Sequence, residues 1–88
     1  MRIRFLEKGG QRAFLDLVIE GLKVSSLRGI LQFGFDVPYS TLKNYYVGAR
    51  LMGEDLVREM CDLSGVDFEG LEIERVEENW GQRKGGLA

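Results

Sequence analysis

The sequence contains no histidine, and among its 88 residues there is one cysteine and one proline. Without histidine, the chain has no Ser-His or Cys-His nucleophile system and no histidine metal ligand. The single cysteine, Cys61, has no partner for a disulfide within the chain, which is typical of a reducing compartment. We interpret it as a small buried residue rather than a reactive thiol. We therefore expect that the protein is not an enzyme and needs no cofactor.

Long apolar runs are also missing. No stretch approaches the roughly 20 apolar residues of a membrane-spanning helix, and residues 1–8 lack the apolar segment of a signal peptide. We expect a cytoplasmic protein with no membrane partner. The length and the charged fraction of 30% are typical of one small globular domain.

Charge is distributed unevenly along the chain. The net charge is −2, although nucleic-acid-binding proteins are often basic. Acidic residues gather between Glu54 and Glu78, whereas residues 21–51 contain one acid, Asp36. The cations of that middle region are Lys23, Arg28, Lys43 and Arg50. The middle of the chain is therefore locally basic, and the distribution of charge matters more to a binding surface than the net value.

The spacing of apolar residues predicts four helices. A stripe at i, i+3, i+4, i+7 and i+8 predicts a first helix over 11–22. Ser25 and Ser26 are suited to cap a second helix, and Pro38 to begin a third, which should end near Gly48. A fourth is expected over 53–64. The residues expected to face the core are Phe14, Leu17, Val18, Gly21 and Leu22; Leu27, Ile30 and Leu31; Leu42 and Tyr45; and Leu56, Val57, Met60 and Leu63.

Two short segments alternate polar and apolar residues, which is typical of β-strands. They are residues 2–5 and 71–74, and their charges are opposite. If the strands pair, Ile3 and Phe5 lie near Leu71 and Ile73, and the arginines face the glutamates. The predicted fold is mainly α: a four-helix helix-turn-helix domain over 1–78 with a short two-stranded sheet formed by the N- and C-terminal segments, followed by a basic, glycine-rich tail over 79–88.

The segment from Ser26 to Tyr45 carries the functional prediction. A helix-turn-helix needs a first helix, a tight turn and a recognition helix with one buried and one open face. Val37 is expected to fill the turn, and the recognition helix to run over 39–47. Its open face and the flanking cations are the predicted DNA contacts: Tyr39, Ser40, Thr41, Lys43, Asn44, Tyr46, Val47, Arg50, Arg28 and Lys23.

These residue types suit a DNA groove. The amide of Asn44 can pair with adenine, and Lys43 can reach guanine or a phosphate. Tyr39 and Ser40 stand at the helix start, where free amides attract phosphate. Tyr46 and the three flanking cations are expected to touch the backbone. Spacing alone leaves an ordinary solvated helix face as an equal alternative.

The stretch from Val37 to Gly48 resembles the recognition helix of the lambda-repressor-like (Xre/Cro-type) helix-turn-helix superfamily, with its Thr-Leu pair, aromatic residue and closing glycine. Residues 51–67 resemble the next helix of that family. The end of the chain, Trp80-Gly81-Gln82-Arg83-Lys84-Gly85-Gly86, is similar to the tail of small archaeal proteins with such a domain; a similar module precedes LAGLIDADG-type endonuclease domains. The resemblance implies sequence-specific DNA binding by a transcriptional regulator or a targeting module.

Two positions depart from the family pattern. Gln32 stands where a small residue is usual, which puts the angle between the two helices in doubt. Asp36 stands where glycine is usual in the turn, and we expect it to tolerate the left-handed conformation there.

Other partners remain open at this point. A lone domain touches few base pairs, so we expect a homodimer or a fused or associated partner. The tyrosine-rich face or the acidic C-terminal half suits a protein-protein interaction module. The tyrosines could also stack on RNA bases. In the tail, Trp80 is expected to pack on the domain, and Arg83 and Lys84 form a possible basic arm toward DNA.

Overall fold

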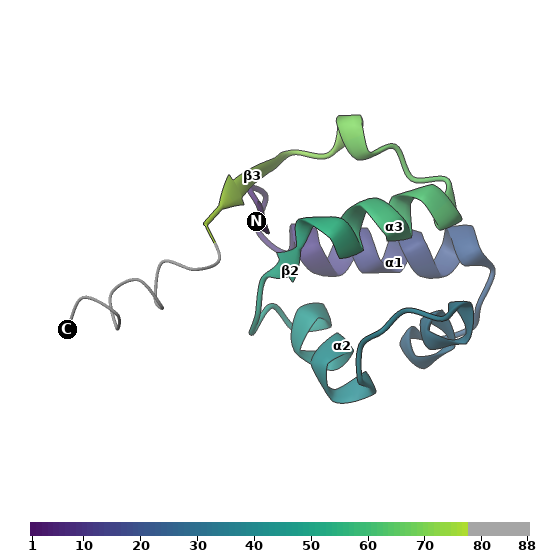
Figure 1. Ribbon diagram of the computed structural model, residues 1–88. Helices are drawn as coiled ribbons and strands as arrows, with labels where there is room; N and C mark the ends of the chain where they lie inside the picture. The colour runs from purple at the N-terminus through teal and green to yellow at the C-terminus, as the bar shows by residue number, and fades with distance from the viewer. Residues whose placement is uncertain (78–88) are drawn as a thin grey trace.

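The computed structural model describes residues 1–77, and the predicted basic tail lies outside the described residues. The elements in chain order are β1 (Arg2–Phe5), α1 (Gly10–Leu22), the 3-10 helix η1 (Leu27–Phe33), α2 (Tyr39–Tyr46), β2 (Met52–Gly53), α3 (Glu54–Ser64), the 3-10 turn η2 (Phe68–Gly70) and β3 (Ile73–Val76) (Figure 1). The chain is mainly helical, as predicted. The helix expected over 39–47 ends one residue earlier, and Gly48 takes the left-handed conformation that follows it, with φ +81°.

Helix α1 is the centre of the fold. Helix α3 packs along one side of it, and α2 and η1 lie on the other side (Figure 1). Gly21 is at a close contact between α1 and the end of α3, where a β-carbon would come 2.2 Å from the carbonyl oxygen of Ser64. The core joins all these elements, and its fully buried members are Ile3, Phe14, Leu15, Val18, Ile30, Leu42, Met52, Val57 and Met60.

The two ends of the described chain pair, as predicted, but Arg2 lies opposite Val76 rather than a glutamate and Ile3 lies opposite Arg75. The sheet is also larger than expected. Strands β1 and β3 are antiparallel, with Arg4 opposite Glu74 and Phe5 opposite Ile73. The side chains of Arg4 and Glu74 form an ion pair. The prediction of two strands is wrong, because β2 pairs with the other side of β1 and gives the order β2-β1-β3.

The last strand begins two residues later than predicted. Leu71 and Glu72 precede β3, because η2 turns the chain just before them. The carboxylate of Asp67 accepts the N–H of Glu69, and the N–H of Leu71 donates to the carbonyl of Phe68. These local bonds are those of a tight turn, so Leu71 stays outside the strand. Glu72 contributes its carbonyl, which accepts the N–H of Leu6 at 3.0 Å.

The second helix is a 3-10 helix, and its predicted serine cap does not form. Ser26 precedes η1, but its side chain makes no capping hydrogen bond. Within η1, Gly29 is buried and approaches Val24 so closely that a β-carbon would lie 2.8 Å from that side chain. Gln32 is exposed, so its bulk does not enter the contact between the two helices, and Gly29 is the small residue at the tight contact.

The turn between η1 and α2 uses a different residue from the one predicted. Gly34, with φ +86°, takes the left-handed conformation, and Asp36 does not. Glycine adopts this conformation without the penalty of a β-carbon, which explains the preference. Phe35 is buried at 7% exposure, while Val37 is half-buried against the core. Phe35 therefore fills the turn more fully than the predicted Val37.

Two leucines assigned to the core by their spacing are exposed. Leu17 on α1 is 49% exposed and Leu63 on α3 is 50% exposed. Leu15 and Cys61 occupy the buried faces instead. The buried face of each helix is thus rotated by a fraction of a turn from the predicted one. Only part of the run of apolar residues on each helix faces the neighbouring elements.

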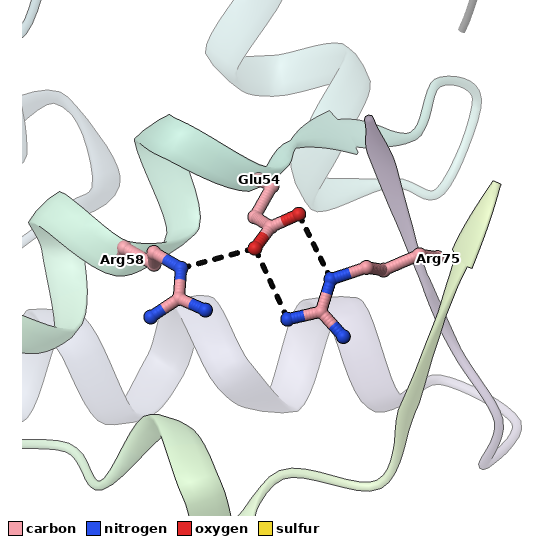
Figure 2. A network of polar contacts seen from close by, with 3 residues as sticks. All are labelled: Glu54, Arg58 and Arg75. Carbon is pink, nitrogen blue, oxygen red and sulfur yellow. Dashed lines mark hydrogen bonds and ion pairs between the residues drawn. The ribbon is translucent and has the colours of Figure 1, made fainter. Parts of the chain in front are cut away.

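An ionic network fastens the start of α3 to β3 (Figure 2). The carboxylate of Glu54 accepts two hydrogen bonds from Arg75, at 3.0 and 3.1 Å, and one from Arg58, at 3.0 Å. The hydrogen bonds from Arg75, followed by those from Arg58, lower the pKa of Glu54 from 4.5 to about 2. The same contact with Glu54 raises the pKa of Arg75. The first turn of α3 is therefore held to the edge strand of the sheet.

Candidate nucleic-acid interface

Helix α2 is anchored by one face and open on the other. Leu42 and Tyr45 are buried, as predicted. Thr41 is half-buried. The exposed residues on and just after the helix are Ser40, Lys43, Asn44 and Val47, of which Val47 is 69% exposed. The sequence-predicted contacts on α2 thus include a continuous set of solvent-facing side chains.

The predicted contacts on this face have different surroundings. Tyr39, Lys43 and Tyr46 line a groove between α2, α1 and η1. Ser40 and Asn44 are exposed and are not part of that groove. Ser40 and Asn44 are therefore available to a broad partner such as a duplex, whereas Lys43 and Val47 border a concave surface.

Tyr39 gathers two cations at the start of α2. The guanidinium of Arg28 lies 4.2 Å from the ring centroid, and the ammonium of Lys43 lies 5.7 Å from it. Both distances are within the range of cation–π attraction. Tyr39 is half-buried, and its ring contacts one cation from η1 and one from α2. Sequence reasoning identified these residues separately, without their mutual contact.

Tyr46 is engaged with α1. Its hydroxyl donates to Oδ1 of Asp16 at 2.8 Å, and the guanidinium of Arg12 lies 4.8 Å from its ring centroid. Tyr46 was expected to touch a DNA backbone, and its hydroxyl is instead directed to a carboxylate. Sequence reasoning missed Arg12 and gave Asp16 no role. Their i, i+4 spacing on α1 is the signal that they share a face.

The remaining predicted cations flank α2 on two sides. Lys23 and Arg28 line a hollow of about 370 Å³ at the start of η1, which Ser25 and Ser26 also line. Arg50 is exposed in the segment that follows α2. The structure therefore brings Lys23 and Arg28 together, while Arg50 stands apart beyond the C-terminal end of α2.

Gln11 fixes the C-terminal end of α2 on α1. This side chain is only 8% exposed, and its Nε2 donates to the carbonyl oxygens of Tyr45 and Arg50, each at 2.7 Å. Gln11 was missed as a functional residue. It lies three residues before Phe14 on the apolar stripe of α1, and a polar residue on such a stripe was the available signal.

The acidic half of the chain lies away from this surface. Most of the acids after residue 53 are on α3, η2 and β3. Helix α3 packs on the opposite side of α1 from α2 (Figure 1). The net charge of −2 therefore hides a separation between an acidic side and the surface around α2, where Lys23, Arg28, Lys43 and Arg50 are exposed.

Within residues 1–77, no group of three or more histidine, cysteine, aspartate or glutamate side chains is arranged to hold a metal ion. None of the helices in this part of the chain is long and apolar enough to cross a membrane. The possible basic arm, Arg83 and Lys84, lies outside the described residues. Comparisons with protein-family models, with curated proteins and with solved structures found no match.

Proposed function

We propose that this domain binds double-stranded DNA, with η1 and α2 acting as a helix-turn-helix and α2 entering the major groove. The observation that carries the proposal is the division of α2 into a buried side, Leu42 and Tyr45, and an exposed side with Ser40, Lys43 and Asn44. A major groove about 12 Å wide accepts one α-helix with side chains of this kind.

The exposed side chains have the chemistry for reading bases. Asn44 offers a donor and an acceptor that match the major-groove edge of adenine. Lys43 donates to the acceptors of guanine or to a phosphate, and Val47 offers an apolar surface to a thymine methyl group. Lys43 and Asn44 are neighbours on the open side of α2, and Val47 follows about one turn later, just after the helix ends; recognition helices present such side chains to neighbouring base pairs.

Phosphate contacts come from the surroundings of α2. No side chain caps its N-terminus, so the first-turn amides remain as donors for an anion. Lys23 and Arg28 border the hollow before η1, and Arg50 follows α2. Contacts on both sides of a groove-bound helix fix its register on the duplex. A regulator or a DNA-targeting module built on one such domain gains specificity from a second copy or a fused partner.

The test is fluorescence anisotropy with a random pool of labelled duplexes at low and moderate salt. We expect salt-dependent binding by the natural chain. The double variant Lys43→Ala/Asn44→Ala should lose most of it, and Lys43→Ala alone should lower the slope of log affinity against log salt by about 0.9. Arg58→Ala is the matched control, because it removes one cation from α3, on the opposite side of α1.

Two outcomes contradict the proposal. One is no binding at micromolar protein in low salt. The other is equal loss in Lys43→Ala and Arg58→Ala, which indicates attraction by general charge. Binding to a protein partner that changes little with salt, and that the Val47→Ala variant weakens, supports the alternative of an interaction module, since Val47 is the most exposed large apolar residue of the described chain.

A further inference from the structure

The groove beside α2 has the size of a small-molecule site. It is an open groove of about 510 Å³ between α1, η1 and α2, and ligand pockets in proteins span roughly 300–1,000 Å³. Ile19 from α1 and Leu27 from η1 give it apolar walls, and Tyr39 and Tyr46 add two aromatic side chains. These four residues are half-buried, so each presents part of its surface to an occupant.

The polar groups of the groove favour an anion. Lys43 supplies an exposed ammonium, and Ser25 and Ser26 supply hydroxyl groups. Asp16 also lines the groove, but its Oδ1 already accepts the hydroxyl proton of Tyr46. A buried or half-buried anionic group is most stable where a cation and hydroxyl donors converge on it.

Two further cations reinforce this preference. Arg28 lies over the ring of Tyr39, and Arg12 lies over the ring of Tyr46. Lys43 lines the groove itself, and the two arginines contact the aromatic rings that line it, whereas the lining contains one carboxylate, Asp16. The excess of positive charge beside apolar and aromatic walls matches a ligand that has an apolar body and one negative charge.

We propose that this groove binds a small arylalkyl carboxylate. The carboxylate lies against the Lys43 ammonium and the Ser25 and Ser26 hydroxyls, and the aromatic body fills the space between Ile19 and Leu27. The regulatory part of this proposal rests on the proposed function. A carboxylate bound to Lys43 neutralises a cation that otherwise contacts DNA. The ligand and DNA then compete, and by linkage each lowers the affinity for the other by the same factor.

Ligand binding is tested without DNA. The 15N-labelled chain is titrated with 3-phenylpropionate, and with 3-phenylpropionamide as the neutral molecule of the same shape, while amide shifts are followed by NMR. We expect saturable shifts clustered at Ser25, Ser26 and Lys43, with clearly tighter binding of the carboxylate. Lys43→Met should abolish the preference for the carboxylate. Lys23→Met, which removes a cation that borders only the neighbouring hollow, should keep it.

The site is disproved by the absence of saturable shifts with either probe, or by a carboxylate preference that Lys43→Met leaves intact. The regulatory part is tested by anisotropy at about 150 mM salt, where loss of one phosphate contact lowers affinity about fivefold. Saturating 3-phenylpropionate should produce a loss of that size and the amide should not. If the chain binds the ligand but no duplex, the proposed function is overturned and the ligand site is not. If the bound carboxylate leaves duplex binding unchanged, the proposed regulation is overturned.

Discussion

The Nε2 of Gln11 lies 2.7 Å from the carbonyl oxygen of Tyr45, so the first turn of α1 holds the last turn of α2. The same nitrogen donates to the carbonyl of Arg50, in the segment that follows α2. One buried amide thus sets where α2 ends and how the chain leaves it. The position of the candidate recognition surface depends on this contact as much as on the apolar side chains beneath it.

Replacement of Gln11 by leucine should destabilise the domain by about 1–3 kcal/mol, because two carbonyl groups lose their donor in a buried place. The measurement is urea unfolding followed by circular dichroism. Gln32→Leu is the matched control, since Gln32 is exposed and should change the free energy of unfolding little. Equal effects of the two substitutions would show that the Gln11 contacts do not matter to the fold.

Acid should weaken the link between α3 and β3. The pKa of Glu54 is lowered from 4.5 to about 2, so its ionised form stabilises the folded state fully above about pH 4.5, and this contribution is lost as the pH falls toward 2. In the Glu54→Gln variant, thermal stability should therefore depend less on pH in this window. Glu59→Gln, exposed on the same helix, serves as the control. A pH profile of Glu54→Gln parallel to that of the natural chain contradicts the role assigned to Glu54.

Added salt should reduce the difference in stability between the natural chain and Glu54→Gln, because the ion pairs of Glu54 are accessible to solvent.

Gly21→Ala should destabilise the domain although alanine is normally the better helix former. The added β-carbon would lie 2.2 Å from the carbonyl oxygen of Ser64, so α1 and α3 must separate. Overpacking of this kind costs about 1–3 kcal/mol, more than the roughly 1 kcal/mol that helix propensity returns. Ala13→Gly, at an exposed position of the same helix, measures the propensity term alone. A more stable Gly21→Ala variant would mean that the two helices are not in such close contact.

Cys61 should react with thiol reagents only when the domain opens. Burial, followed by the nearby carboxylates of Asp62 and Asp67, raises the pKa of the thiol, so little thiolate forms and access is poor. Labelling with a disulfide reagent at pH 8 should be slow in buffer and fast in urea. A Cys61→Ala/Leu63→Cys variant, which moves the thiol to a half-exposed position on the same helix, should react quickly in both. Fast native labelling of Cys61 contradicts the buried placement.

Much of the fold follows from patterns within the sequence, and the exceptions share a cause. The approximate helix limits and the pairing of the two ends were predictable, because apolar periodicity, glycines and alternating residues act locally. The burial of Leu15 in place of Leu17 was not predictable, because it depends on which side of α1 meets α3. The strand β2 has two residues, too few for any periodic pattern, and it forms only because β1 is beside it.

The candidate site likewise has features that the sequence predicts and features that it does not. The exposure of Lys43 and Asn44 followed from the burial of Leu42 and Tyr45, two residues of one helix. The contacts of Tyr46 with Asp16 and of Arg28 with Tyr39 join different elements, so they required the arrangement of the helices. The proposed ligand groove is made wholly of such contacts, and no segment of the sequence contains it.

Strand β1 is between β2 and β3, with Arg2 opposite both Gly53 and Val76. During synthesis this strand leaves the ribosome before both of its neighbours, and its pairing with β3 is complete only when residue 76 has been added. The contacts among α1, η1 and α2 are close in sequence and can form earlier. The surface around α2 is therefore expected to assemble before the sheet is complete, and until then β1 exposes an unpaired edge that other chains can join.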